Sequence, residues 1–412
     1  MKFSQKKKSS IAIIGSRGIP NNYGGFECFT ENISQKLSKK DYEVYVSCEQ
    51  PEGVDPPEKF EDVNLFYFPI KHPKSNVLGM IYEIMYDAYS LLYSSLKADQ
   101  IYMLGYSAAF FFFIPKLFGK TLYLNPDGFE WKRNKFSGMI KLMLKIQERM
   151  GVFWADKIIA DSMGIKEYYD NKYSKSSKFI AYGVSEIPEI GWNDEYLPGS
   201  LRGVIEDSNY WLLVARLEPE NNVHTIVESY IKSKTKKPLV IVGNFLNSDY
   251  QETINNMIEG MDETKNIVFT GGIYDQKSLN MLRQNCFGYI HGHSVGGTNP
   301  SLIEAMVMEN ILLTHRNQFN EEVCQDSALY FKDSDELATK MDDVDNHPDQ
   351  YQIMKKLALS RVKQEYSWEK IVAAYDEVFG NEYNNQNRQH SPNKFPLSKG
   401  YKSDYNSKNN SK

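Results

Sequence analysis

Two glycine-rich loops of this 412-residue sequence each follow a short apolar run and precede a segment with helical spacing. The first reads IAIIGSRGIPNNYGGFE at residues 11–27 and places Gly24 and Gly25 directly before the helical segment. A helix N-terminus offers unpaired N–H groups and the positive end of the helix dipole, so it suits a phosphate group. The loop matches neither the GxGxxG fingerprint nor a Walker A loop. A phosphate site and an ordinary strand–turn–helix connection therefore both stay open.

The second loop reads HGHSVGGTNPSLIEAM at residues 291–306. Pro300 fits the first turn of a helix, and either Thr298 or Asn299 fits its N-cap position. Glu304 then lies about one turn inside the helix. Its carboxylate can accept hydrogen bonds from sugar hydroxyl groups while the helix start holds a phosphate.

Charged side chains follow two further apolar runs. The segment VARLEPENN places Arg216 at the carboxyl end of a strand, where open α/β sheets bind ligands. Its planar guanidinium can clamp a diphosphate, and the alternative is a surface ion pair with a glutamate that follows it. The segment LNPDGFEWKRNKF places Asp127 after another strand, either facing the same cleft or in a solvated turn. The same turn carries three more charged residues, Glu130, Lys132 and Arg133.

Residue types that bind metals occur without a complete ligand set. His291 and His293 would share one face of a strand, but no third ligand is evident near them. Two DxD strings, at residues 333–335 and 343–345, fit structural roles at a helix better than a divalent-ion site. The four cysteines form no CxxC pair, which excludes a zinc ribbon and a thioredoxin-type motif. We therefore expect no bound metal.

Short apolar runs alternate with longer amphipathic segments, and this pattern predicts the elements that position these residues. In the first half, strands are expected at 11–15, 43–47, 63–68, 100–103, 121–124, 157–160 and 178–181, and helices at 25–39, 78–96, 135–150 and 163–171. In the second half, strands are expected at 210–214, 239–242, 267–269, 286–290 and 311–314, and helices at 223–232, 250–261, 276–283, 300–308, 351–364 and 368–379. Such alternation is typical of an α/β fold with doubly wound parallel sheets.

Changes in pattern and composition divide the chain into five parts. A basic N-terminal arm covers residues 1–9, and two Rossmann-like domains cover residues 10–192 and 193–366, with a stretch of irregular pattern at their junction. A closing helix is expected at 367–380. The segment 381–412 is rich in Asn, Ser and Lys and is predicted to be a disordered tail.

Four segments, in this order, resemble the GT-B glycosyltransferases, and most closely those of family 4, which retain the anomeric configuration of the sugar. They are GSRGIPNNYGGFE, NPDGFEWKR, ARLEPENN and GGTNPSLIEAM. Together they resemble the bacterial rhamnosyltransferase subgroup of capsule and exopolysaccharide synthesis, over residues 11–379. The resemblance implies two Rossmann-like doubly wound domains that face a cleft, with a C-terminal helix that returns toward the first domain.

The resemblance also implies which residues hold the nucleotide sugar. Two first-domain glycines match a loop near the donor diphosphate, and four residues of the second domain match the loop over the donor sugar and phosphates. These residues are Gly24, Gly25, Gly296, Gly297, Thr298 and Asn299.

Three side chains match positions that carry the chemistry in related enzymes. Arg216 matches the arginine that binds the diphosphate, and Glu304 matches the glutamate that bonds the nucleotide ribose. Asp127 lies where related enzymes place a polar residue against the sugar ring.

Two positions depart from the wider family. That family often has a second glutamate eight positions before the one that matches Glu304, where this sequence has Gly296. It also usually pairs the arginine with a lysine five positions later, where this sequence has Asn221. The rhamnosyltransferase-like subgroup shares both departures, which favours it over a generic glucosyltransferase.

The resemblance therefore predicts a retaining hexosyltransferase that moves L-rhamnose from dTDP-rhamnose to a lipid-linked saccharide acceptor. The nucleotide-diphosphate sugar is a substrate, and no cofactor is expected. Three alternatives stay open: a family-4 transferase with a UDP-hexose donor, a nucleotide-sugar epimerase of the same shape, and a nucleotide-sugar-binding scaffold without catalysis.

Charge and apolar patterning bear on location and partners. The net charge of −5 argues against nucleic acid as a partner. Residues 1–8 and residues 381–412 each carry +4, which leaves −13 on the body between them, so the basic ends are the parts expected to attract an anionic membrane.

Two apolar segments, at 78–96 and 108–118, are expected either in the first-domain core, the favoured interpretation, or against lipid. No apolar run reaches the roughly 20 residues of a membrane span, and the N-terminal segment has no signal-peptide core. We expect a cytoplasmic protein with a peripheral contact to the inner face of the cell membrane.

Overall fold

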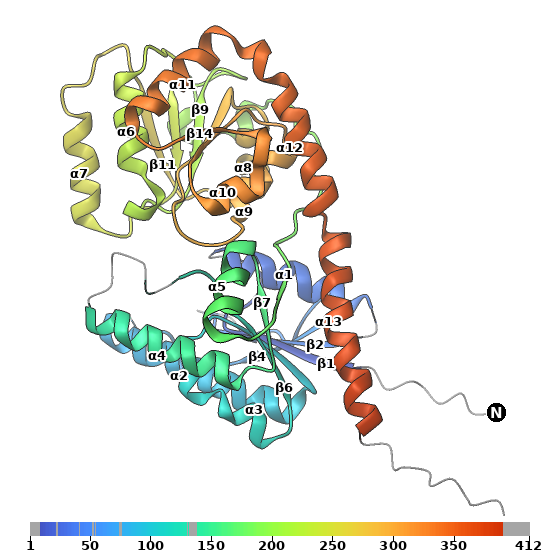
Figure 1. Cartoon of the computed structure of the whole chain (residues 1–412). Helices are drawn as coiled ribbons and strands as arrows, with labels where there is room; N and C mark the ends of the chain where they lie inside the picture. The colour runs from blue at the N-terminus through green and yellow to red at the C-terminus, as the bar shows by residue number, and fades with distance from the viewer. Residues whose placement is uncertain are drawn as a thin grey trace, which may run out of the picture.

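The computed structural model describes residues 9–21, 24–40, 42–51, 53, 55–73, 76–129, 131 and 138–389, with side chains up to residue 380 except those of residues 76, 77 and 80. They form two α/β domains, which lie one above the other in Figure 1, and a long C-terminal helix that runs from their interface along the first domain. The α/β fold class predicted from the sequence is confirmed.

The first domain contains an eight-stranded sheet in the order β3-β4-β2-β1-β5-β6-β7-β8. All neighbours are parallel except β3 and β4, which pair antiparallel. Its strands are β1 (Ser9–Ile14), β2 (Tyr42–Cys48), β3 (Lys59–Phe60), β4 (Val63–Tyr67), β5 (Gln100–Leu104), β6 (Thr121–Asn125), β7 (Lys157–Ala160) and β8 (Ser177–Phe179). Its helices are α1 (Gly25–Ser38), α2 (Asn76–Lys97), α3 (Phe113–Leu117), α4 (Gly138–Trp154) and α5 (Met163–Tyr173). Every residue of β1 and β5 is buried, as expected for central parallel strands with helices on both faces.

The second domain contains a six-stranded, all-parallel sheet in the order β11-β10-β9-β12-β13-β14. Its strands are β9 (Trp211–Val214), β10 (Leu239–Val242), β11 (Ile267–Gly271), β12 (Gly288–His291), β13 (Leu312–His315) and β14 (Leu329–Phe331). Its helices are α6 (Val223–Lys232), α7 (Ser248–Ile258), α8 (Gln276–Gln284), α9 (Pro300–Val307), α10 (Gln318–Cys324), α11 (Ser334–Asn346) and α12 (Gln352–Glu365). Asp333, from the first DxD string, caps α11 by accepting a hydrogen bond from the Glu336 N–H at 2.9 Å, which confirms its structural role.

The last helix, α13 (Trp368–Gln389), returns from the second domain to the first (Figure 1). Its Tyr375 hydroxyl lies 2.9 Å from the Tyr102 hydroxyl of β5, and its Asp376 carboxylate accepts a hydrogen bond from Tyr42 of β2 at 2.9 Å. The predicted return of the C-terminal helix is confirmed. The helix runs to Gln389, past the predicted boundary at residue 380, while residues 390–412 of the predicted tail lie outside the described residues.

Each sheet has one point where the strand order reverses. In the first sheet this point lies between β1 and β5, and in the second it lies between β9 and β12. Connections leave in opposite directions there, which opens a crevice outside the carboxyl ends of the strands, and open α/β sheets bind ligands at this place. The loops that follow β1, β9 and β12 are those singled out from the sequence.

Helix α2 bears out the favoured interpretation of the apolar segment at 78–96 only in part. Leu91 is 0% exposed and lies in the core, whereas Ile81, Met85 and Leu92 are between 44% and 51% accessible. The opposite face, which includes Tyr82 and Tyr86, packs inward instead. The Phe-rich segment at 108–118 divides in the same way, because Phe112 is buried while Phe110, Phe113 and Phe118 are exposed. Among the described residues, no helix has the length and apolar character needed to cross a bilayer.

Candidate functional site

The predicted site residues of the two domains meet across the interface. A Cβ placed on Gly25, at the start of α1, would lie 3.7 Å from Cγ of Pro300, at the start of α9. A Cβ on Gly128, after β6, would lie 3.0 Å from Cα of Gly296. The carboxyl ends of the two sheets therefore face one another, and the glycine loops approach closely because they carry no side chains there.

The loop before α9 is held by its own capping residue and by the first domain. Asn299 is the N-cap: its side-chain oxygen accepts hydrogen bonds from the Ser301 N–H at 3.0 Å and the Ser301 hydroxyl at 2.9 Å. Thr298 is buried, and its hydroxyl donates to the carbonyl oxygen of Asp161 in the first domain. Gly296 has φ +114°, a conformation that side chains rarely adopt. The loop is thereby fixed with the N–H groups of the α9 start beside it.

Glu304 lies one turn inside α9 and forms an ion pair that the sequence analysis did not predict. Its Oε2 accepts from Nη2 of Arg283, in the last turn of α8, at 2.7 Å. The Arg283 side chain is only 4% exposed, whereas that of Glu304 is 24% exposed. The arginine thus anchors the carboxylate from the protein interior, while the carboxylate keeps access to the interface. Arginines are rarely so buried, so sequence alone gave no reason to select Arg283.

A small cavity of about 20 Å³ lies between the domains next to this pair. It is lined from both sides, by Cys28, Phe29, Tyr182, Gly183, Pro300, Ile303, Glu304 and Trp368. Burial, and after it the nearby Glu304 and Glu31, raise the pKa of the Cys28 thiol to about 12. A protonated thiol is a poor nucleophile, so these surroundings do not activate Cys28.

Arg216 follows β9 and is 55% exposed, with its Nε 3.7 Å from Oε2 of Glu218. This position fits both interpretations of Arg216. The guanidinium lies at the carboxyl end of β9, where it could bind a diphosphate, and it also lies near a glutamate that follows it. Asn221, which stands where related enzymes have a lysine, is buried and donates from Nδ2 to the Arg216 carbonyl oxygen at 2.7 Å. It fixes the backbone of the arginine loop and adds no positive charge.

Hydrogen bonds join this arginine loop to the residues that follow β12. Asn222 donates from Nδ2 to the Gly292 carbonyl oxygen at 2.8 Å, and the Ser294 hydroxyl donates to the Glu220 carbonyl oxygen at 2.7 Å. A Cβ on Gly292 would lie 2.1 Å from the Asn221 carbonyl oxygen, so only glycine fits there. The Arg216 loop and the second glycine loop are therefore joined by hydrogen bonds and a close backbone approach.

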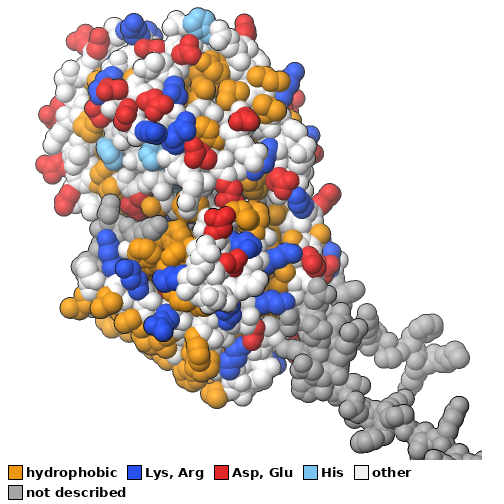
Figure 2. Space-filling model, viewed as in Figure 1, with side chains coloured by type: hydrophobic (Ala, Val, Ile, Leu, Met, Phe, Trp, Pro, Cys, Tyr) orange, Lys and Arg blue, Asp and Glu red, His pale blue; other side chains and the backbone are white. Residues whose placement is uncertain are grey.

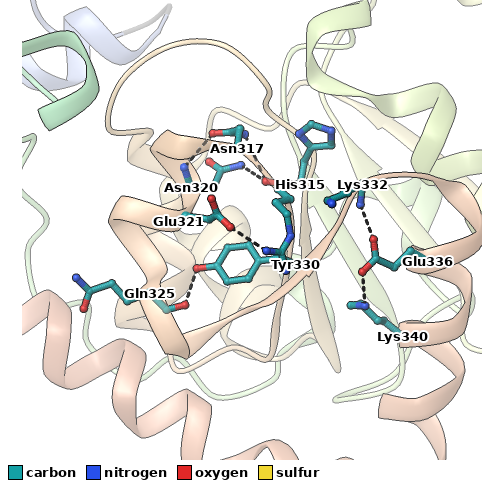
Figure 3. A network of polar contacts seen from close by, with 10 residues as sticks. His315, Asn317, Asn320, Glu321, Gln325, Tyr330, Lys332, Glu336 and Lys340 are labelled. Carbon is teal, nitrogen blue, oxygen red and sulfur yellow. Dashed lines mark hydrogen bonds and ion pairs between the residues drawn. The ribbon is translucent and has the colours of Figure 1, made fainter. Parts of the chain in front are cut away.

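The network in Figure 3 supports the same loop from its other side. Asn317 and Asn320 both donate side-chain hydrogen bonds to the carbonyl oxygens of His293 and His315. Figure 3 shows those to His315. Asn317 also caps α10 through its side-chain oxygen, which accepts from the N–H groups of the next turn. The start of α10 is thus tied to the ends of β12 and β13.

His291 and His293 stack with ring centroids 4.3 Å apart. Burial is the largest cause that lowers the pKa of each ring. The neighbouring His293 lowers the pKa of His291 further. Arg216 lowers the pKa of His293 further, to about 3. Both rings are therefore neutral near pH 7. Among the residues that the structure describes, no three histidine, cysteine or acidic side chains are grouped so as to hold a metal ion. The expectation of a metal-independent protein stays a prediction.

Several buried polar atoms around the interface have no hydrogen-bond partner within the described protein. They belong mainly to residues at the carboxyl end of the second sheet and to one residue opposite them. These residues are Asp161, Glu220, Arg283, His291, His293, Thr314 and His315. An unpaired buried polar group costs about 1–3 kcal/mol, so a ligand that supplies hydrogen bonds here gains affinity from groups that are already positioned.

Asp127 adopts the left-handed conformation, with φ +57°, and its N–H donates to Oδ1 of Asn125 at 2.9 Å. Because the next residue, Gly128, approaches Gly296, the Asp127 turn faces the cleft rather than bulk solvent alone. The other charged residues of this turn, Glu130, Lys132 and Arg133, lie outside the described residues, as do Lys2 and Lys6 to Lys8 of the basic arm.

Family models match both domains. Residues 202–361 match the model of the glycosyl transferases group 1, and residues 8–185 match a domain of unknown function, DUF1972. The second domain is a group 1 glycosyl transferase domain. Arg216, the 296–299 loop and Glu304 all lie inside this glycosyl transferase domain, whereas Gly24, Gly25 and Asp127 lie in the DUF1972 match. No curated protein matches the chain.

Solved structures share this two-domain arrangement. Sucrose-phosphate synthase from Thermosynechococcus elongatus superposes with a TM-score of 0.74 at 14% identity, over 92% of this chain and 100% of that chain. HepE of Anabaena in complex with UDP-glucose gives 0.67 at 14% identity, over 91% and 99%. The trehalose 6-phosphate synthase of Burkholderia multivorans gives 0.69 at 11% identity, over 95% and 100%. These likenesses show that the glycosyl transferase domain and its partner domain form a GT-B fold.

Proposed function

We propose that the chain is a retaining glycosyltransferase that moves a sugar from a nucleoside diphosphate to an acceptor hydroxyl in its interdomain cleft. The observation that carries the proposal is the convergence of Arg216, the 296–299 loop and Glu304 in a group 1 glycosyl transferase domain, opposite the first-domain loops. The arginine suits the diphosphate, the α9 start suits a phosphate, and the carboxylate suits the ribose hydroxyls.

The main catalytic task is to stabilise the charge that develops on the leaving diphosphate. Preorganised donors do this well, because they need no rearrangement during the reaction. Arg216 and the N–H groups at the start of α9 supply such donors without a metal ion. In the retaining mechanism proposed here, the acceptor attacks from the face of the leaving group, and a phosphate oxygen helps to take its proton. Asp127 holds the sugar or the acceptor, and closure of the domains excludes water, which would otherwise hydrolyse the donor.

For the donor, we propose dTDP-rhamnose on the basis of the motif resemblance. Gly296 removes a carboxylate that a hexose with more hydroxyl groups would use, and Asn221 serves the backbone instead of adding a cation. A UDP-hexose is the second candidate, because the solved structures of HepE hold UDP and UDP-glucose on the same fold. A non-catalytic scaffold would bind the nucleotide sugar and leave it intact.

For the acceptor, we propose a lipid-linked saccharide presented at a membrane surface. Fifteen of the 21 large hydrophobic side chains exposed in the described part of the chain belong to three neighbouring segments of the first domain, α2, residues 110–118 and α4, and we call this set the apolar face. It comprises Leu78, Ile81, Met85, Leu92, Leu96, Phe110, Phe113, Leu117, Phe118, Met139, Ile140, Leu142, Met143, Ile146 and Phe153. Figure 2 shows hydrophobic side chains gathered along the lower left edge of the first domain, beside basic ones. Exposed patches of this size mark interaction sites with proteins or membranes.

The arrangement on α2 and α4 favours lipid as the partner. On α2, the exposed residues 78, 81, 85, 92 and 96 recur at helical spacing, so they form a stripe along the outer surface. On α4, Met139 is 83% exposed and Phe153 is 74% exposed, with exposed Lys145 and Arg149 between them. Apolar side chains mixed with basic ones are typical of helices that lie in the interface of an anionic bilayer.

Flotation with anionic vesicles tests this membrane contact. The double variant Leu142→Glu/Ile146→Glu should reduce vesicle binding at least tenfold, because two charges replace groups that would enter the lipid. The matched control is Ile353→Glu/Leu357→Glu, two similarly exposed positions on α12 of the second domain, which should float like the wild type. Equal flotation of all three proteins would contradict the apolar face as the site of contact.

The transfer reaction itself is tested by mass spectrometry of the product. Protein incubated with dTDP-rhamnose and a glucose-terminated polyprenyl diphosphate should yield an acceptor heavier by one deoxyhexose. Parallel reactions with UDP-hexoses identify the alternative donor, and conversion of the nucleotide sugar without acceptor identifies an epimerase. Binding of a nucleotide sugar in a thermal-shift assay with no consumption in any reaction would refute catalysis and leave the scaffold.

A further inference from the structure

Asp161 is a buried acidic residue at the interface that has no role in the mechanism described above. It follows β7 directly and is 1% exposed, and the next residue, Ser162, caps α5. The Asp161 Oδ1 atom is buried and has no hydrogen-bond partner within the described protein. An unpaired buried carboxyl oxygen is unfavourable, so a hydrogen bond from a ligand to this atom would stabilise the complex.

The carboxyl group points at the glycine loop of the other domain. A Cβ placed on Gly297 would lie 1.9 Å from Asp161 Oδ1 and 2.6 Å from Oδ2, so the carboxyl occupies the place of a side chain at residue 297. The Asp161 carbonyl oxygen also accepts the hydrogen bond from the Thr298 hydroxyl. One first-domain residue therefore contacts the 296–299 loop through both its main chain and its side chain.

The surroundings of Asp161 favour the neutral carboxyl. Burial raises its pKa well above the usual range, and the nearby Asp127 raises it further. A hydrogen bond from Tyr182 opposes this effect, while Glu322 adds to the increase. A neutral carboxyl group both donates and accepts hydrogen bonds, and it would not repel an anionic diphosphate bound nearby.

We infer that Asp161 is a recognition residue for the sugar of the donor, contributed by the first domain to the 296–299 loop of the second. The inference rests on the proposed function. Gly296 and Gly297 present only backbone groups, and the three atoms nearest to a Cβ placed on Gly297 all belong to the Asp161 carboxyl. A purely structural carboxyl would have both oxygens paired within the protein, whereas Oδ1 is left for a hydroxyl group of the sugar.

The test compares the affinity for a nucleotide sugar with that for the nucleotide alone. By titration calorimetry, Asp161→Ala should bind dTDP-rhamnose, or UDP-glucose if the wild type prefers it, at least tenfold more weakly than the wild type. Its affinity for dTDP or UDP should stay within twofold, because the nucleotide binds on the second domain. Asp161→Asn, which keeps the size, the neutrality and both kinds of hydrogen-bonding atom, should recover most of the lost affinity and provides a second variant if the alanine protein does not fold.

Asp156→Asn is the matched control, because Asp156 lies just before the other end of β7 and accepts a hydrogen bond from the Leu122 N–H at 2.7 Å. It should change neither affinity. Equal weakening of nucleotide and nucleotide sugar by Asp161→Ala, or no weakening of either, would overturn the inference. Failure of the proposed function is distinguishable from both, because the wild type would then bind neither nucleotide sugar.

Discussion

Removing either partner of the Arg283–Glu304 ion pair should destabilise the second domain, but by unequal amounts. The two groups are 2.7 Å apart, and the arginine is 4% exposed against 24% for the glutamate. Glu304→Leu leaves a guanidinium without countercharge in the protein interior. Arg283→Met leaves a carboxylate that retains contact with water. The asymmetry of exposure therefore predicts an asymmetry of cost.

The expected magnitudes follow from the burial. Removing one partner of a buried ion pair costs about 3–5 kcal/mol when the remaining charge has no access to water, which applies to Glu304→Leu. Arg283→Met should cost about 1–2 kcal/mol, because the remaining carboxylate is partly hydrated. For a domain of this size, 1 kcal/mol corresponds to about 2–4 °C in Tm. The expected decreases are thus roughly 6–20 °C for Glu304→Leu and roughly 2–8 °C for Arg283→Met.

Scanning calorimetry of the two single variants and of Arg283→Met/Glu304→Leu measures these differences. The double variant should melt above Glu304→Leu, because no unpaired charge remains buried and the apolar side chains fill a similar volume. The reasoning is refuted if Glu304→Leu melts within 2 °C of the wild type, or if Arg283→Met is the more costly change. Either result would mean that Arg283 is not held by Glu304 alone.

Three further predictions concern closure, pH and metal. Gly297→Ala should reduce transfer at least tenfold with little change in Tm, because its Cβ would lie 1.9 Å from Asp161 Oδ1 across the interface, whereas Gly191→Ala, with no atom within 4 Å of the added group, should leave transfer unchanged. Equal rates for both variants would contradict the close approach of the two domains. Stability should fall as the pH decreases below about 6.5, because the pKa values of His291 and His293 are lowered in the folded protein and only the unfolded chain gains those protons. Each group contributes about 1.4 kcal/mol per pH unit, so the free energy of unfolding measured in urea should be several kcal/mol lower at pH 5.0 than at pH 7.5. His293→Asn should reduce this difference. A loss of stability above pH 6.5 instead would contradict the prediction. Sugar transfer should continue undiminished in excess chelator, and strict dependence on Mg²⁺ would revive a divalent-ion role for a DxD string.

Patterns of apolar residues predicted the strands and long helices well, because each central strand is buried on both faces and reads as an uninterrupted apolar run. The strand expected at 239–242 is β10 (Leu239–Val242), and the helix expected at 223–232 is α6 (Val223–Lys232). The elements α3, α10 and β14 were not predicted, because each is seven residues or shorter and contains less than two periods of its pattern.

The face that a helix buries was harder to predict than the helix itself. Helix α2 buries a face rich in Tyr and Ser together with Leu91, whereas Ile81, Met85 and Leu92 are exposed. The usual preference for aliphatic side chains in a core therefore predicted this face only in part. Burial of Tyr86 is compensated by hydrogen bonds from its hydroxyl to the Ser16 carbonyl oxygen at 2.7 Å and to the Ser47 hydroxyl at 3.0 Å. These partners lie 70 and 39 residues away, so the local pattern does not contain them.

The site was predicted in so far as its residues follow strands in recognisable motifs. Asp161 and Arg283 were missed because their importance comes from tertiary contacts, with the 296–299 loop and with Glu304, and not from a local motif. The stretch that contains Asp161 resembles an ordinary strand end before a helix cap. Contacts between domains are the information that a single sequence does not supply.

The central claim is that Arg216 and the second glycine loop bind a nucleoside diphosphate at the carboxyl end of the second sheet. Titration calorimetry of dTDP and UDP with the wild type and Arg216→Ala tests it most directly. A charged hydrogen bond contributes about 1.5–3 kcal/mol, so the variant should bind the preferred nucleotide about 10- to 150-fold more weakly. Because the side chain is 55% exposed, the variant should also melt at the temperature of the wild type. Equal Kd values for the two proteins, or no binding of either nucleotide to the wild type, would contradict the claim.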